Sequence, residues 1–301
     1  MEHAEIISEA YAYTKQAFFS LSTLPRWIVL FFYIVGPIIA GYIAATVVFQ
    51  LLALPVLTTL LVNDSFGFTP ENLSYILQFF AGLIGVGCVF LIPLMQGYCV
   101  RVFRSNDALP QTGNLWGLFF NGWRVNLTII IYMIPLFVIS FVYMLVFFYF
   151  FPDTGMYAPA ELVNQEGLLY VGTVFSYAAL QFVTIICVAL FAFVGITHLA
   201  RTGSIRDAVS FRTISGIIRK IGWYDYILSL VIMSILYLMV TFVLLFLTQL
   251  FSHNIFASAI FTILYIFVLV PITVFFVRYL SNVYDTAFVV AETDDEDFDD
   301  F

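Results

Sequence analysis

Residues 125–151 read VNLTIIIYMIPLFVISFVYMLVFFYFF and contain no charged side chain. A helix needs about 20 predominantly apolar residues to cross the roughly 30 Å of hydrocarbon in a bilayer. Five more uncharged stretches are at least that long, at residues 27–62, 73–100, 168–199, 226–251 and 255–277. The sequence therefore predicts an all-α integral membrane protein with six transmembrane helices.

The composition of the chain favours a single membrane domain. Of its 301 residues, 62% are hydrophobic and 10% are charged, whereas about 25% of the residues in soluble domains are charged. We expect a cytoplasmic amphipathic segment at 1–24, a six-helix membrane domain at 25–287 and a disordered acidic tail at 288–301. Within the membrane domain we expect three helical hairpins, at about 27–100, 125–199 and 226–280.

The eleven Lys and Arg residues predict the orientation of the chain. They precede the first stretch, follow the last, or lie between stretches two and three and between four and five. Because basic residues near helix ends are retained in the cytoplasm, we expect a multi-pass plasma-membrane protein with both termini in the cytoplasm. The first loop on the opposite side carries glycosylation-type sequons at Asn63 and Asn72.

Several residue types recur at an offset of one hundred positions. The pairs are Arg101 and Arg201, Asp107 and Asp207, Ala108 and Ala208, Gly122 and Gly222, and Trp123 and Trp223. Arg278 and Asp285 give a looser third copy. We interpret the chain as three parallel-repeat hairpins, each preceded by a cytoplasmic interfacial segment. The alternative is that cytoplasmic membrane edges select Arg and Trp independently.

Residues 204–223 carry the clearest signal for an interfacial helix, because isoleucines alternate with basic residues at helical spacing. This pattern is typical of a helix in the headgroup layer, with its basic side chains on anionic lipid. An ordinary connecting helix packed under the bundle explains the pattern equally well. Residues 2–21 and 114–123 show weaker versions of it.

The predicted helices contain no Asp, Glu, Lys or Arg, so carboxylate-driven transport lacks its usual residues. Their main polar groups are the amides of Gln78, Gln96 and Gln181. These amides either line a cavity for a neutral or lipidic ligand or bridge neighbouring helices. A carrier or channel for such a solute is therefore an alternative function.

The remaining candidates lie at the cytoplasmic edge, where we expect an interface. They are Arg101, Asp107, Trp123, His198, Arg201, Asp207, Trp223, Arg278 and Asp285. The aspartates could form an acid cluster, but their spacing after arginine favours ion pairs within each loop or helix caps. The sequence offers no catalytic, cofactor-binding or metal-binding constellation, so we expect no cofactor and a protein that is not an enzyme. It also offers no basic surface for nucleic acid.

Seven of the last ten residues are acidic, and Phe298 and Phe301 interrupt or follow them. Such a segment either stays solvated or docks a basic protein partner. Membrane lipids are the other expected partners. The leading expectation is a non-enzymatic membrane protein that organises lipid or partner proteins at the cytoplasmic face.

Four short motifs resemble an uncharacterised, largely archaeal membrane family, domain of unknown function 4013. They are Gly97-Tyr98-Cys99-Val100-Arg101-Val102, Leu109-Pro110, Asn121-Gly122-Trp123 and Tyr132-Met133-Ile134-Pro135. The run His198-Leu199-Ala200-Arg201 leading into residues 208–211 fits the same family. The resemblance covers residues 25–285 and implies a multi-span fold in an archaeal plasma membrane, without catalytic residues to carry over.

Overall fold

The computed structural model describes residues 3–19, 23–61, 70–105, 110–150, 165–250 and 255–296. Helices make up almost all of these residues, and no strand occurs among them. In chain order the helices are α1 (His3–Phe18), α2 (Leu24–Val48), the π-helix η2 (Phe49–Ala53), α3 (Leu54–Leu61), α4 (Pro70–Leu91), α5 (Leu94–Arg104), α6 (Leu115–Phe150), α7 (Gln165–Thr202), α8 (Ile205–Ala208), α9 (Phe211–Ile221), α10 (Trp223–Leu250) and α11 (Ile255–Glu296).

Six helical runs in the described part of the chain are long and apolar enough to cross a membrane. They are Leu24–Leu51, Leu73–Arg104, Leu115–Phe150, Leu169–Thr202, Trp223–Leu247 and Ile260–Phe288. Their side chains are largely unburied, and the most apolar stretch of the third run has no buried residue at all. Apolar surface of this extent is stable only against hydrocarbon, so the protein is an all-α membrane protein.

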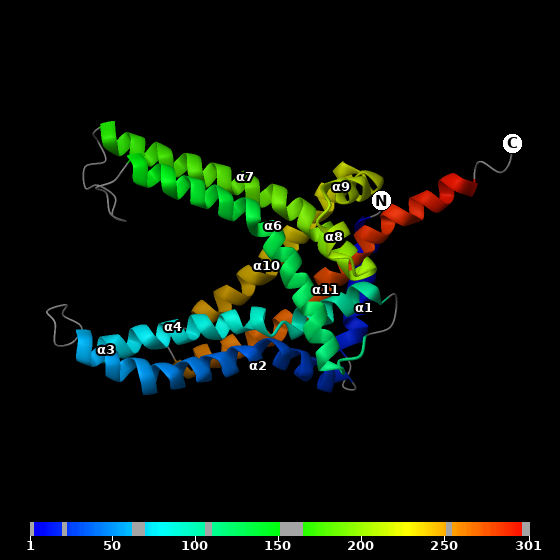
Figure 1. Cartoon of the computed structure of the whole chain (residues 1–301). Coiled ribbons are helices and arrows are strands. Elements are labelled where there is room, and N and C mark those ends of the chain that lie inside the picture. Colours follow the sequence, from blue (N-terminus) through cyan, green and yellow to red (C-terminus); the bar gives the residue numbers. More distant parts are fainter. Residues whose placement is uncertain are drawn as a thin grey trace.

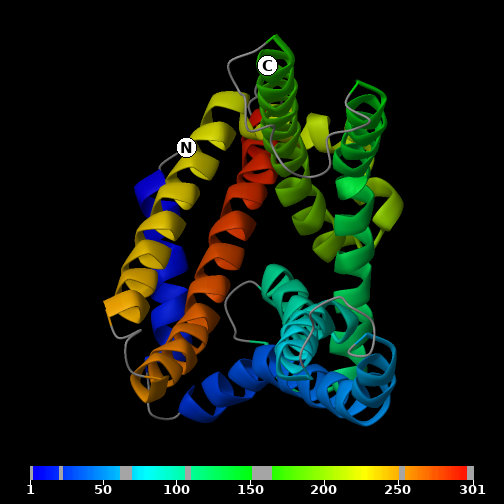
Figure 2. The ribbon, with the colours of Figure 1, turned by 90° about the vertical axis from the view of Figure 1, so that its left-hand side faces the viewer.

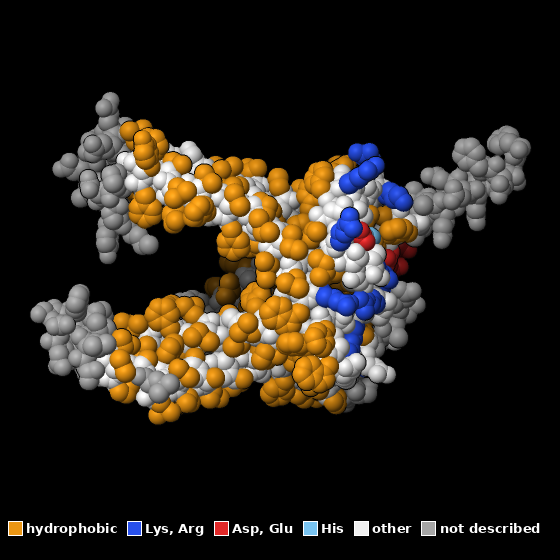
Figure 3. All heavy atoms as spheres, in the orientation of Figure 1, with side chains coloured by type: hydrophobic (Ala, Val, Ile, Leu, Met, Phe, Trp, Pro, Cys, Tyr) orange, Lys and Arg blue, Asp and Glu red, His pale blue; other side chains and the backbone are white. Residues whose placement is uncertain are grey.

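Consecutive long helices lie side by side in pairs, which we call arms. The arms are α2 with α4, α6 with α7, and α10 with α11 (Figures 1 and 2). The first two arms diverge from each other, and the apolar surface is hollowed between them (Figure 3). The contacts that join the arms are concentrated at one end of the molecule.

That end is the hub, which consists of α1, α5, α8 and α9 packed against the adjoining ends of the long helices (Figure 1). Its buried residues form two connected apolar clusters, in which Tyr98, Leu118, Ile218 and Tyr279 are almost fully enclosed. The described Lys and Arg side chains gather on the surface of this end (Figure 3). The hub therefore combines the best-packed core with the charged surface.

The first long helical run continues beyond the length of one crossing, as its uncharged stretch predicted. It passes from α2 through η2 into α3 without leaving helical geometry. Pro55 is the second residue after η2 and has no backbone N–H, so the regular i to i−4 bonding pattern cannot continue there. A π-turn is a common response to such an interruption, and it places the irregular backbone next to the proline.

The second run contains a break that hydropathy did not indicate. Helix α4 ends at Leu91 and α5 begins at Leu94, with Pro93 between them. Pro93 cannot donate to the carbonyl of Val89, and the N–H of Leu94 turns to Ile92 O at 2.9 Å instead of Phe90 O. Two carbonyls are thereby freed inside an apolar region, where unpaired polar groups are costly.

Helix α11 is longer than the sequence predicted at its end. It continues to Glu296, past residue 288, where we expected the acidic tail to begin. The apolar residues at positions 289–291 do not stop a helix, which explains why the backbone pattern runs on. Residues 297–301 lie outside the described part of the chain.

Candidate functional site

Three arginines link the ends of α5 and α7 to the middle of α11 in a closed cycle at the hub. Arg278 of α11 donates from Nη1 to the carbonyl oxygen of Ser105, at the end of α5, over 2.6 Å. Arg104 of α5 donates from Nε to the carbonyl oxygen of Ala200 on α7 over 2.5 Å. Arg201 of α7 completes the cycle by binding α11. We call this set of contacts the arginine junction.

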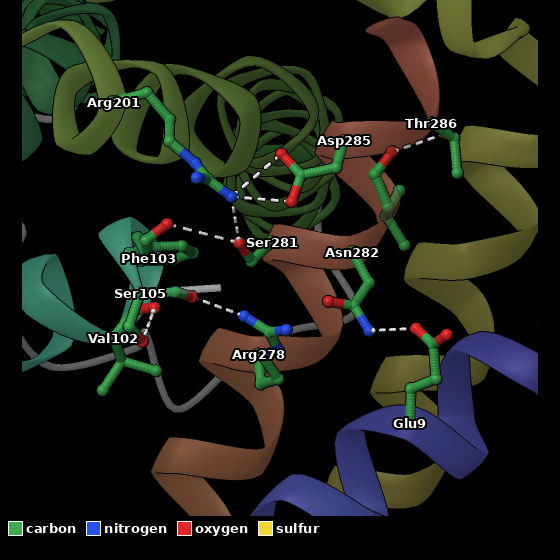
Figure 4. Close-up of polar contacts among 11 residues, drawn as sticks. Glu9, Val102, Phe103, Ser105, Arg201, Arg278, Ser281, Asn282, Asp285 and Thr286 are labelled. Carbon is green, nitrogen blue, oxygen red and sulfur yellow. Dashed lines mark hydrogen bonds and ion pairs between the residues drawn. The ribbon is translucent and has the colours of Figure 1, made fainter. Parts of the chain in front are cut away.

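Arg201 forms the most highly charged contact of the junction (Figure 4). Its Nη2 atom lies 2.9 and 2.6 Å from the two carboxylate oxygens of Asp285 and 2.9 Å from Ser281 Oγ. The side chains of Arg201 and Asp285 are 23% and 44% exposed, so water screens the pair in part. The sequence predicted ion pairs within each loop, whereas this pair joins two helices that are far apart in the chain.

Helix α1 packs along α11 and closes the junction from one side. The ring of Tyr13 lies 4.9 Å from the guanidinium carbon of Arg278, and its hydroxyl is 3.1 Å from Ser105 Oγ. Glu9 accepts from Asn282 Nδ2 at 3.0 Å (Figure 4). Burial raises the pKa of Tyr13, although the hydrogen bond with Ser105 and the charge of Arg278 lower it. The tyrosine is thus a neutral platform for the cation.

The histidines at the hub have partners that sequence spacing did not reveal. His198 Nδ1 lies 2.8 Å from the hydroxyl of Tyr284 on α11. His3 lies 3.6 Å from the carboxylate of Asp225 and 3.3 Å from Ser229 Oγ, both on α10. Each histidine therefore connects its helix to another, and no group of three or more potential metal ligands occurs among the described residues.

The other predicted interface residues are scattered over the hub. Arg101 donates to the carbonyls of Gln111, Gly113 and Asn114 and so orders the chain before α6. Asp207 is exposed in α8, and its N–H donates to the capping hydroxyl of Ser204. Asp107 and Asn63 lie outside the described residues, and Asn72 lies near the start of α4.

The repeated Gly-Trp pairs occupy different backbone settings. Gly122 and Trp123 lie inside α6, which includes residues 115–123 of the segment that we expected to be interfacial. Gly222 instead ends α9 with a φ of 94°, a conformation that favours glycine, and Trp223 begins α10. The shared residues therefore do not impose the same local structure.

Helix α9 presents two unlike faces. Its apolar face, formed by Ile214, Ile217, Ile218 and Ile221, is buried against α7, α10 and α11. This packing agrees with the second interpretation of residues 204–223, a connecting helix under the bundle. Tyr132 fixes the preceding α8 by donating to Ala208 O at 2.6 Å.

The opposite face of α9 and the adjoining α8 are basic, and we call this surface the α9 basic face. It consists of the exposed side chains of Arg206, Arg212, Arg219 and Lys220. Phe211 and Tyr224 flank it and are 70% and 78% exposed. Aromatic and basic side chains together are typical of the membrane–water boundary.

The three predicted amides do not meet. Gln78 is exposed on the surface of α4 and lies 3.5 Å from Ser74 Oγ. Gln96 donates to Val89 O at 3.4 Å, which is one of the carbonyls freed by Pro93. Gln181 joins α7 to α6 through Ser140 Oγ at 2.5 Å and also donates to Tyr177 at 2.9 Å on its own helix. Gln96 thus bonds across the break at Pro93, and Gln181 bonds from α7 to α6.

A groove of about 360 Å³ opens between α6 and α7 beside the Gln181 contacts. Its walls are mostly aliphatic and include Val142, Tyr143 and Leu180. The hydroxyls of Thr173 and Ser176 also line it, but both bond back to carbonyls of α7 at 2.7 Å. The groove is thus an apolar surface at membrane depth.

Sequence reasoning missed Asn126, which is buried on α6. Its Nδ2 atom donates to Phe90 O at 2.7 Å, the second carbonyl freed by Pro93. The only signal available was a polar amide at the start of an uncharged stretch. Ser281 was also missed, because hydroxyls are common in helices and nothing marks its partner Arg201.

Comparison with known families bears on this arrangement. The sequence matches the family described as a protein of unknown function, DUF4013, over residues 79–249, more than half of the chain. The chain belongs to the DUF4013 family. The resemblance drawn from the short motifs is thereby confirmed. No curated protein and no solved structure matches the chain.

The DUF4013 match runs from α4 to the end of α10. It includes Arg104 and Arg201 of the arginine junction, the break at Pro93 and the α9 basic face. Helix α11, which carries Arg278 and Asp285, lies beyond the matched region. The family description states no activity, so function has to be argued from the geometry.

Proposed function

We propose that this DUF4013 member is a non-enzymatic membrane protein that organises lipid at the cytoplasmic face of the plasma membrane. The observation that carries the proposal is the α9 basic face with its exposed aromatic flanks, held on a packed hub. Anionic headgroups attract each nearby Lys or Arg by about 1 kcal/mol. Apolar arms would at the same time contact the acyl chains.

The distribution of charge supports the proposed orientation. The basic side chains gather at the hub, and retention of Lys and Arg in the cytoplasm would place the hub there. Both α1 and the last turns of α11 lie at this end, so both termini would be cytoplasmic (Figure 1). We also propose that the arms are three parallel-repeat hairpins, since each one starts and returns at the hub.

The contacts of the acidic residues favour a non-enzymatic role. Asp285 is engaged by Arg201, and Asp225 lies beside His3. Asp207 is on the exposed side of α8, so these carboxylates do not converge on one reacting position. General acid–base catalysis needs such groups within hydrogen-bond reach of the same substrate atoms.

Lipid retention in nanodiscs of mixed phosphatidylglycerol and phosphatidylcholine tests the proposal by native mass spectrometry. The variant Arg206→Gln with Arg212→Gln should retain up to about 30-fold less anionic lipid at low salt, from about 1 kcal/mol for each charge. The control Lys15→Gln with Arg124→Gln removes the same charge from exposed sites on α1 and α6. Equal retention of both lipids by the unmodified protein would contradict the proposal.

A carrier for a lipidic or neutral solute is the second candidate, and the groove between α6 and α7 favours it. A scrambling assay with fluorescent phosphatidylcholine in proteoliposomes tests this function. Val142→Trp should fill the groove and slow the movement of the lipid. If the unmodified protein does not move the lipid between leaflets, the carrier function is excluded for that substrate.

A further inference from the structure

The α9 basic face is a charged surface without a charged partner among the described residues. Arg212, Arg219 and Lys220 project from the side of α9 that is opposite its buried isoleucines. No ion pair in the described part of the chain includes any of them. Together with Arg206, the face carries four cations and the single acid Asp207. It therefore presents a net positive charge next to the end of α11.

The acidic segment 292–301 begins in the last turns of α11, close along the chain to a contact between α11 and this face. Lys220 Nζ lies 5.7 Å above the ring of Phe288, shortly before Glu292. Helices α9 and α11 pack against each other, and the last turns of α11 leave the hub beside α9 (Figure 1). The segment contains seven acids, which are Glu292, Asp294, Asp295, Glu296, Asp297, Asp299 and Asp300.

We propose that the acidic segment 292–301 covers the α9 basic face of the same molecule and competes there with anionic lipid headgroups. Extended, its ten residues reach about 30 Å, whereas the eleven residues of α9 span about 16 Å. Acidic residues at a helix C-terminus oppose the helix dipole. Unwinding the last turn of α11 would remove acids from the helix C-terminus and bring them to the cations of the α9 basic face. Both changes are electrostatically favourable.

Covalent attachment favours α9 over a basic protein partner. A segment tethered beside its binding face has an effective concentration in the millimolar range. A separate protein would have to displace it. The contact with α9 rests on charge and position alone, whereas the competition with lipid rests on the proposed lipid-organising function.

Zero-length carbodiimide crosslinking tests the contact because the chain has only two lysines, Lys15 and Lys220. In nanodiscs of neutral phosphatidylcholine, peptides joining Lys220 to the acidic segment should exceed those joining Lys15 to it by about tenfold. The excess should vanish in about 1 M salt, where the Debye length is about 3 Å. Arg212→Glu with Arg219→Glu should reduce the Lys220 product and leave Lys15 products unchanged.

Three results would overturn the contact. They are equal yields from the two lysines, a Lys220 yield that salt does not change, and crosslinks found only between two molecules or with a bound basic protein. A monomer carrying the salt-sensitive Lys220 product supports it. The nanodiscs used for crosslinking contain no anionic lipid. The outcome for the contact is therefore independent of the proposed lipid-organising function.

Deletion of residues 292–301 tests the competition. The shortened protein should retain about tenfold more phosphatidylglycerol than the full chain at low salt, because its cations are free. If Lys220 crosslinks to the segment but neither protein prefers phosphatidylglycerol, the lipid function fails and the contact stands. If both proteins retain phosphatidylglycerol equally, the competition is refuted while the lipid function stands.

Discussion

At the scale of the residue, the polar side chains of the hub act as connections between distant segments. Arg201 could be singled out from the sequence because it is a basic residue at the end of an uncharged stretch. Asp285 was also named as an interface residue, but its pairing with Arg201 could not be predicted, since the two residues are on different arms and share no local spacing. Ser281, the other partner, carried no signal at all. The type of residue was therefore predictable, but its contact was not.

A double-mutant cycle on Arg201 and Asp285 tests the charged contact of the junction. Arg201→Gln or Asp285→Asn should each lower the free energy of unfolding by about 1 kcal/mol, because hydrogen bonds to charged groups are lost in a partly screened pair. The double variant should lose less than the sum. Thermal unfolding in detergent measures the change, with Arg206→Gln as an exposed control. Fully additive losses would show that the pair is not coupled.

At the scale of the element, one proline explains both the break in the second run and the contacts of two amides, Gln96 on α5 and Asn126 on α6. Hydropathy treats residues 73–100 as a continuous stretch, because it reads apolar content and not backbone donors. Pro93 could have been identified as an interruption from its missing N–H alone. The sequence could not show that Gln96 and Asn126 supply the replacement donors, because their contacts depend on how α4, α5 and α6 are arranged after folding.

Asn126→Leu tests this account of the break. The substitution leaves Phe90 O without its side-chain donor and should cost about 1 kcal/mol of stability. In a Pro93→Ala background the helix can restore its backbone bonds, so the same substitution should cost much less. Thermal unfolding of the four proteins gives the comparison. An equal cost of Asn126→Leu in both backgrounds would contradict the role assigned to Asn126.

Close packing of α5 on α6 depends on glycine, which gives a second test at this scale. A Cβ atom at Gly122 would lie 2.0 Å from Pro93 O, and one at Gly97 would lie 1.9 Å from Leu118 O. Gly122→Ala should therefore destabilise the protein by about 1–3 kcal/mol through forced backbone shifts. Gly82→Ala is the control, because no atom lies within 4 Å of its added Cβ. It should be neutral or stabilising, and a similar loss in both variants would refute the packing argument.

At the scale of the whole molecule, the sequence predicted the six apolar helices because each is a continuous run of local composition. The hub was not predictable in the same way. Its core joins α1 to α11 and α5 to α7, and such contacts depend on which faces meet after folding. The divergence of the arms follows from this arrangement, since the strongest links between arms, including the arginine junction, lie at the hub.

The arms should therefore move relative to each other while each arm stays paired. Away from the hub, α6 and α7 are joined by Gln181, Ser140 and the stacked rings of Tyr143 and Tyr177, whose centroids are 4.0 Å apart. Regions with few mutual contacts fluctuate at low free-energy cost. Pulsed electron paramagnetic resonance in nanodiscs can compare the motion between arms with the motion within one arm. The three native cysteines are first replaced by alanine.

Spin labels at Phe141 and Phe175 report the distance within the α6–α7 arm, and labels at Phe79 and Phe175 report the distance between arms. All three side chains are exposed, so labelling should not disturb the core. We expect a narrow distance distribution within the arm and a broad one between arms. Gln181→Leu should broaden the distribution within the arm, because the amide can no longer hold α6. An inter-arm distribution as narrow as the one within the arm would show that the arms form a rigid body.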